Sequence, residues 1–281
     1  MNMDFGKAIF GWTIALCAGL FGCSDWERPI LLKTNVVDAS QRVVVIEEFT
    51  GMSCVNCPTG IAISNAIADI YPDNVVLIAI HSKFLGQPAT KGQTDLRVPD
   101  AQAVEDFLGS WLAKPEAAIN RLYSAPHMGY RIGNPDSWKS LVEAELQKAP
   151  EVDLRIQVNF NETSRALRVL LEGTARVDIA KPVHLHCGIT QSGIIADQLD
   201  NSTGKLVNFV HRHALLKMLS SVAGDRLSNS LKSGETFARE YLFTLPVDSV
   251  LWKAEDCNVF GFASRDENEK YILQAAEAPV K

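Results

Sequence analysis

The stretch FTGMSCVNCP, residues 49–58, places two cysteines two residues apart between a strand pattern and a helix pattern. The continuous apolar run at 43–46 just before it predicts a buried parallel strand. After it, apolar residues recur at helical spacing over 61–70, and Pro58 stands at the helix start, where its missing N–H costs little. The order strand, cysteine pair, helix decides how the first half of the chain folds.

A Cys-x-x-Cys pair at the start of a helix is able to do chemistry. The unpaired N–H groups and the helix dipole favour a thiolate on Cys54, and the spacing lets Cys57 close a disulfide onto it. Two plainer interpretations stay open. The pair forms a static structural disulfide, or it is half of a zinc site that takes two more ligands from elsewhere.

Length, composition and charge narrow the class of protein. The chain has 281 residues, a net charge of −6, 47% hydrophobic residues and 21% charged residues. This length accommodates two domains with a core each, and the composition is that of a globular protein. The acidic balance and the lack of a basic run argue against a nucleic-acid partner.

The N-terminus has the features of a targeting signal. Lys7 precedes an apolar run over 8–21, which is shorter than the about 20 residues of a membrane-spanning helix. The run ends in Gly22-Cys23, which resembles the cleavage site of bacterial lipoproteins. We therefore expect a signal peptide at 1–22 and a lipidated Cys23 with a tether at 23–40. An ordinary signal peptide and an uncleaved anchor are the alternatives.

From 41 to 150 the pattern alternates between strand and helix, which predicts a parallel βαβ arrangement. The expected strands lie at 43–49, 74–80 and 117–119, and the expected helices at about 58–71, 100–109 and 135–148. From 151 to 281 the apolar period becomes two, which predicts an all-β domain, most simply a sandwich. Residues 208–220 form an exception and predict a short helix or a crossing loop.

The first half resembles a thioredoxin-fold domain in its order of elements. By this resemblance Cys54 is the attacking thiol, Cys57 the resolving thiol and Glu48 the buried acid that exchanges a proton with Cys57. Pro115, with Lys114 before it, matches the cis-proline that presents backbone to a substrate. The plainer interpretations are a salt-bridged or edge position for Glu48 and the start of an edge strand for Pro115.

The match to thioredoxins has departures that bear on the reaction. Ser53 stands where thioredoxins usually carry an aromatic residue, and Val55-Asn56 fills the place between the cysteines. Residues at these places help to set the redox potential, which spans more than about 100 mV across the fold. The direction of electron flow is therefore left open.

Ile46-Glu47-Glu48-Phe49-Thr50-Gly51 with Cys54, Cys57 and Pro58 resembles the Omp28-related outer-membrane lipoproteins of Bacteroidetes. Gln198 and the run 208–213 add weaker similarity. The resemblance covers nearly all of the mature chain. It implies a lipid-anchored outer-membrane location, facing the periplasm or the outside, and a thioredoxin-like domain followed by a β domain.

Several further side chains are candidates for a role. Glu47 and Glu48 alternate on a strand, so one is expected to be buried and the other exposed. The pairs His184/His186 and His211/His213 share a strand face that a metal could use, but are expected to be ordinary surface histidines. Four cysteines remain in the mature chain, so a second disulfide, Cys187–Cys257, competes with two buried thiols.

The leading hypothesis is therefore an envelope thiol–disulfide oxidoreductase, with Cys54, Cys57 and Glu48 as catalytic residues and Lys114 and Pro115 at the substrate. Its partners would be envelope protein thiols or disulfides, and no cofactor or metal is expected. The rival is a non-catalytic, adhesin-like outer-membrane lipoprotein with a surface partner, in which Cys54–Cys57 staples a loop.

Overall fold

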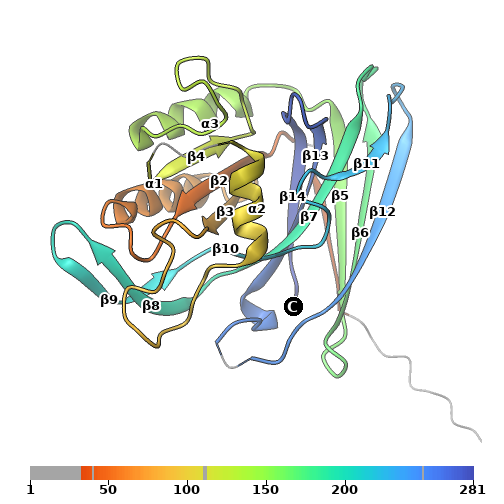
Figure 1. Ribbon diagram of the computed structural model, residues 1–281. Helices are drawn as coiled ribbons and strands as arrows, with labels where there is room; N and C mark the ends of the chain where they lie inside the picture. Colours follow the sequence, from red (N-terminus) through yellow and green to blue (C-terminus); the bar gives the residue numbers. More distant parts are fainter. Residues whose placement is uncertain (1–32, 40, 110–112, 249) are drawn as a thin grey trace, which may run out of the picture. The chain divides into compact units, whose positions relative to one another are not determined.

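A computed structural model describes residues 33–39, 41–109, 113–248 and 250–281 (Figure 1). Sheets dominate this part of the chain and few helices accompany them, so the fold class is α plus β. The predicted signal peptide at 1–22 and the predicted lipidation site Cys23 lie outside the described residues.

The elements follow one another in an order that is α/β first and all-β afterwards. They are β1 (Lys33–Ala39), β2 (Val44–Thr50), α1 (Cys57–Ile70), β3 (Val75–His81), α2 (Pro99–Phe107), β4 (Glu116–Ile119), η1 (Pro135–Ser137), α3 (Trp138–Leu146), β5 (Val152–Phe160), β6 (Ala166–Ala175), β7 (Val183–Gln191), β8 (Ile194–Asp200), β9 (Gly204–His211), β10 (Ala214–Met218), β11 (Asp225–Ser228), β12 (Thr236–Thr244), η2 (Ala254–Asp256), β13 (Cys257–Arg265) and β14 (Ile272–Pro279).

One sheet joins strands from both halves of the sequence. Its order is β14-β13-β7-β10-β3-β2-β4, with β11 also paired to β7. The junction is a parallel pairing of β10 with β3, at Ala214 and Ala79. The division into 41–150 and 151–281 stays a prediction. This sheet, however, contains strands from both sides of residue 150. The described residues of 32–281 form one compact unit.

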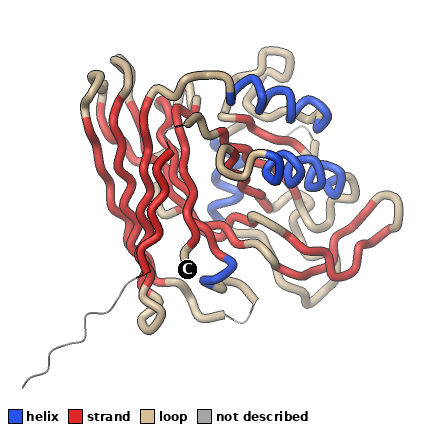
Figure 2. Tube along the Cα trace, turned by 180° about the vertical axis from the view of Figure 1, so that it is seen from behind, coloured by secondary structure: helices blue, strands red, loops and turns tan. Residues whose placement is uncertain are grey.

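A second sheet, in the order β1-β5-β6-β12, shares its core with strands β7, β13 and β14. Figure 2 shows the long strands of this part together, with α1 and α3 at the other end of the large sheet. Strands β8 and β9 form a separate hairpin.

Two segments differ from the sequence-based expectation. Residues 33–39, expected within the tether, form β1, because they pair antiparallel with β5 along their whole length. Residues 208–220, expected as a short helix or loop, supply the end of β9 and all of β10. Pairing of β10 between β7 and β3 outweighs the helical spacing of its leucines, since tertiary context overrides weak local propensity.

Strand β2 is covered on both faces. One face packs in the larger core and the other packs against α1 and α3; the alternating residues are Val43, Val45 and Phe49 on the first face and Val44 and Ile46 on the second. The expectation that one of Glu47 and Glu48 is exposed is therefore wrong, because both carboxyl groups are buried. Glu47 forms a two-point ion pair with Arg121, at 2.8 and 2.7 Å.

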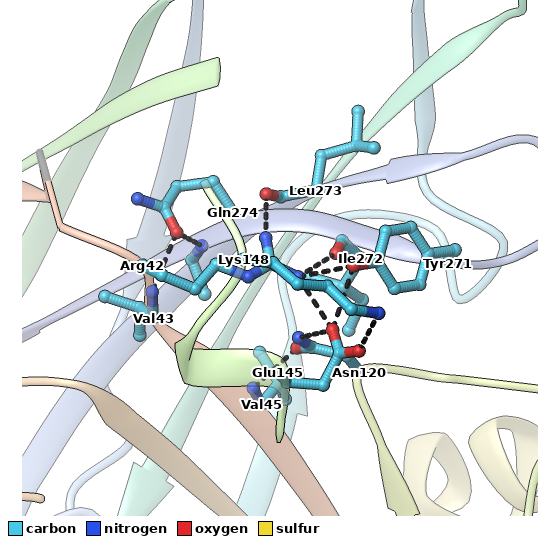
Figure 3. Close-up of polar contacts among 11 residues, drawn as sticks. Arg42, Val43, Val45, Asn120, Glu145, Lys148, Tyr271, Ile272, Leu273 and Gln274 are labelled. Carbon is cyan, nitrogen blue, oxygen red and sulfur yellow. Dashed lines mark hydrogen bonds and ion pairs between the residues drawn. The ribbon is translucent and has the colours of Figure 1, made fainter. Parts of the chain in front are cut away.

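A buried polar network fastens the start of β2 to α3 and β14 (Figure 3). The Arg42 guanidinium donates to Glu145 Oε2 at 3.1 Å and to the Ile272 carbonyl at 3.0 Å. Glu145 also accepts from Asn120 at 2.9 Å and from Tyr271 at 2.8 Å, and it pairs with Lys148. Each member has several partners, as buried charges require.

Candidate functional site: a covered disulfide with a buried acid

The cysteine loop leads directly into α1. Cys54 N donates to Gly51 O at 3.0 Å and Cys57 N to Cys54 O at 3.2 Å, so a tight turn brings the two cysteines together. They form a disulfide, and α1 begins at Cys57 with Pro58 in its first turn. Cys54 is 2% exposed and Cys57 0%. In this state neither sulfur is open to an attacking thiolate.

The β8–β9 hairpin is what covers the cysteine loop, and in Figure 1 it lies next to α1. Gln198 Nε2 donates to Gly51 O at 3.0 Å and to Cys54 O at 3.1 Å. Two backbone bonds follow, from Leu199 N to Met52 O at 2.8 Å and from Asn201 N to Val55 O at 2.9 Å. These bonds resemble those of an added strand.

An aromatic side chain completes the cover. Phe209, on β9, packs against a small apolar cluster that contains Cys54, Cys57 and Ile61. Gln198 and the run 208–213 were noted in the sequence only as weak family similarity. Gln198 and Phe209 contact residues of the cysteine loop about 150 positions earlier in the chain.

Glu48 lies on the face of β2 that packs against α1, and it is 1% exposed. Ser64 Oγ, on α1, donates to Glu48 Oε2 at 2.5 Å. Among the described residues Glu48 Oε1 has no hydrogen-bond partner. Burial raises the pKa of Glu48 to about 7, and the bond from Ser64 opposes that rise. A carboxyl with this pKa is able to take up or release a proton near neutral pH.

Pro115 lies at the junction with α1. The Lys114–Pro115 peptide bond is cis. Pro115 is so close to the helix that a Cβ on Gly60 would come within 2.6 Å of Pro115 Cβ. The glycine at position 60 therefore allows the proline ring to approach α1, three residues after Cys57.

The Lys114 side chain points into the protein. Its Nζ donates to Thr50 O at 2.9 Å, to Ser82 Oγ at 2.6 Å and to Phe84 O at 2.8 Å. Burial lowers the pKa of Lys114 to about 8, while the nearby Glu105 carboxylate opposes the shift. The side chain thus ties together the loops around the cysteine motif. A substrate role for Lys114 and Pro115 stays a prediction about their backbone.

Two of the four histidines expected at the surface, one from each pair, differ from that expectation, whereas His184 and His213 are partly exposed. His211 and His186 are buried, and His186 stacks on Phe262 with ring centroids 4.3 Å apart. His211 lies edge-on to His81, with centroids 5.7 Å apart, and burial lowers the pKa of His211 to about 4. Within the described ranges no group of three or more His, Cys, Asp or Glu residues could hold a metal ion.

The other cysteines of the described chain are not paired. Cys187 and Cys257 are buried free thiols, and burial raises the pKa of both, that of Cys257 to about 12. They behave as small apolar side chains, the plainer of the two interpretations.

Ser64 is a site residue that the sequence does not single out. The one feature that could have pointed to it is its position two helical turns after Cys57, on the same face of α1.

Fold and site together define an α-plus-β protein with a covered Cys-x-x-Cys disulfide at the start of a helix. The chain belongs to the family of outer membrane protein Omp28, which matches residues 109–281. This membership supports an envelope location associated with the outer membrane. No helix of the described residues is long and apolar enough to cross a membrane.

Solved structures share the fold. HBP35 of Porphyromonas gingivalis is 20% identical with a TM-score of 0.64, and the alignment covers 84% of this chain and 74% of that one. Protein AGR_C_4864 of Agrobacterium tumefaciens is 13% identical with a TM-score of 0.51, covering 86% and 97%. At these identities the likeness shows the fold alone. No curated protein matches the chain.

Proposed function

We propose that this outer-membrane family member is a lipid-anchored envelope protein that carries out thiol–disulfide exchange through Cys54 and Cys57. In this proposal a thioredoxin-like region, 41–150, holds the site, a β-sandwich region, 151–281, follows it, and Cys23 carries the lipid. The partners are thiols or disulfides of envelope proteins. The Omp28 membership and the fold shared with HBP35 are consistent with this arrangement.

The observation that carries the proposal is Glu48. A carboxyl group buried with a single donor is costly, and a disulfide that only staples a loop gains nothing from it. A resolving thiol, in contrast, needs a group that exchanges a proton near neutral pH. Glu48 is on the face of β2 that packs against the helix carrying Cys57, and its Oε1 accepts no hydrogen bond from the part of the chain that the structure describes.

The exchange proceeds in two balanced steps from the reduced protein. The Cys54 thiolate attacks one sulfur of a substrate disulfide, which forms a mixed disulfide and releases the first substrate thiolate. Cys57 then gives its proton to Glu48 and attacks the Cys54 sulfur. The second substrate thiolate leaves, and Cys54–Cys57 is oxidised while the substrate is reduced. Oxidation of a substrate dithiol is the same sequence in reverse.

Both directions require the β8–β9 hairpin to move, because Gln198 and Phe209 lie over the cysteine loop. Exchange is therefore limited to partners that displace the hairpin or meet it while it is open. Local opening of a segment held by a few hydrogen bonds is a common native-state event.

Trapping of the mixed disulfide tests the function. Reduced Cys57→Ser protein, mixed with a small disulfide such as oxidised glutathione, is expected to accumulate one adduct on Cys54, measured by intact mass. Cys54→Ser is expected to accumulate none at Cys57, which is completely buried. Absence of an adduct on Cys54 over hours at pH 8 would contradict the proposal.

A second candidate function has its own observation. The near-complete burial of both sulfurs favours a structural disulfide in a binding protein of the outer membrane. That candidate predicts that reduced Cys54 stays unreactive and that Glu48→Gln leaves every redox property unchanged.

A further inference from the structure

Ser64 occupies an unusual place on α1. It is fully buried, and the residues of α1 that share its buried face are Cys57, Gly60, Ile61, Ile67 and Ala68. Apart from Cys57 at its start, Ser64 is the one side chain of this face with a hydrogen-bonding group. Because residues seven apart lie on one side of a helix, Ser64 and Cys57 lie on the same side of α1.

Two acceptors lie within hydrogen-bond distance of the Ser64 hydroxyl. A serine inside a helix commonly donates back to a carbonyl of the preceding turn. Here Oγ lies 3.2 Å from Ile61 O but 2.5 Å from Glu48 Oε2. A hydroxyl has one proton to donate, and bonds to carboxylates are the shorter and stronger ones. The geometry therefore indicates that the Ser64 hydroxyl donates its hydrogen bond to Glu48 Oε2.

The consequence is a carboxyl group with two unlike oxygens. Oε2 is held by Ser64, whereas Oε1 is buried and has no partner among the described residues. We propose that Ser64 is a positioning residue for the exchange reaction: its hydroxyl fixes the Glu48 carboxyl against α1 and leaves Oε1 as the acceptor for the Cys57 proton. This inference rests on the proposed function, which supplies the proton transfer.

Ser64 has a second effect, through the charge of Glu48. A donor to the carboxylate favours the ionised form, so the bond keeps the acid able to release its proton in the neutral range. Without the hydroxyl the ionised group would have no hydrogen bond among the described residues. Glu48 would then stay protonated to higher pH and would accept the thiol proton less readily.

The test compares Ser64→Ala with two matched controls. Ser64→Thr keeps a hydroxyl at the site, and Ser140→Ala removes an exposed hydroxyl on α3 that donates to the Ser137 carbonyl at the end of η1. The readout is the Glu48 carboxyl resonance, assigned by its loss in Glu48→Gln and followed by NMR against pH. Ser64→Ala is expected to raise the apparent pKa by about one unit, while the controls leave it unchanged. An unchanged titration in Ser64→Ala would overturn the proposal.

A double variant separates positioning from packing. In the Glu48→Gln background Ser64→Ala is expected to leave the pH profile of exchange unchanged, whereas in the wild-type background it shifts that profile upward. An equal effect of Ser64→Ala in both backgrounds would mean that it acts through packing and would contradict the proposal. If the wild-type protein performs no exchange while the Glu48 titration still responds to Ser64, the proposed function fails and the hydrogen-bond assignment stands.

Discussion

Glu145 and Glu48 are both almost fully buried glutamates, and their surroundings are opposite. Although burial acts to raise it, bonds from Lys148, Asn120 and Tyr271 hold the pKa of Glu145 below its ordinary value. Glu48 has only the Ser64 hydroxyl, and burial raises its pKa to about 7. The same side chain is held as an anion in one place and titrates near neutral pH in the other.

The difference lies in how many partners the fold supplies. Around Glu145 the polar groups come from α3, β14 and the start of β2, so the carboxylate joins distant parts of the chain. Around Glu48 the sheet and α1 offer apolar side chains and one hydroxyl. Removing one partner of a compensated buried charge strongly destabilises a fold, whereas a poorly compensated buried carboxyl has the kind of shifted pKa that is common at reactive sites.

The strongest effect is expected from removing a partner of Glu145. Arg42→Met removes a buried cation and leaves Glu145 with less compensation, so the free energy of unfolding is expected to fall by about 3 to 5 kcal/mol. Denaturant unfolding measures this. The matched control is Arg97→Met, which breaks the exposed pair with Asp95 and is expected to cost about 0 to 1 kcal/mol. Equal losses in the two variants would show that the network does not stabilise the fold.

The next effect concerns the pH dependence that Glu48 imposes on stability. The native state holds the Glu48 proton up to a pKa of about 7, above the ordinary 4.5, so in this window it binds more protons than the unfolded chain. Stability is therefore lost as pH rises from 4.5 to 7, by about 3 kcal/mol for this group. Glu48→Gln is expected to remove that part of the fall.

Denaturant unfolding of the wild type and of Glu48→Gln at pH 5 and pH 8 measures the difference. Glu277, whose pKa burial also raises to about 7, adds to the pH dependence of both proteins and cancels in this comparison. Parallel stability curves for the two proteins would contradict the assignment of a raised pKa to Glu48.

The weakest effect is expected from removing part of the cover that the β8–β9 hairpin forms over the cysteine loop. Phe209→Ala removes the aromatic ring that packs on the disulfide, so alkylation of Cys54 in the reduced protein is expected to become about tenfold faster. The control is Val210→Ala, the neighbouring residue on β9, whose side chain is 50% exposed. Equal rates in both variants and the wild type would show that Phe209 does not restrict access.

Much of the first half of the fold follows from the sequence. The apolar runs and the position of Pro58 predict β2, α1 and β3, and the two-residue spacing predicts the Cys54–Cys57 disulfide. Period-two alternation likewise predicts strands after 151, but not in the segment 208–220 that supplies the end of β9 and all of β10. These are local patterns, which a single segment carries without reference to its neighbours.

The parts that the sequence does not predict depend on contacts between distant segments. Whether Glu47 is exposed depends on Arg121 and on the larger core that covers its face of β2. The cover depends on β8 hydrogen bonding to the cysteine loop. The inward direction of Lys114 depends on the carbonyls of Thr50, at the end of β2, and of Phe84, in the loop after β3. None of these leaves a periodic pattern in its own segment.

A redox titration is the direct test of whether Cys54–Cys57 exchanges electrons with partners. The protein from about residue 30 onward is equilibrated in glutathione buffers, reduced Cys54 is alkylated, and the labelled fraction is read by mass. We predict a reversible transition between about −120 and −270 mV, the range of thiol–disulfide oxidoreductases. A disulfide that stays oxidised below about −300 mV, with Cys54 unreactive after forced reduction, would contradict the account and leave a structural staple.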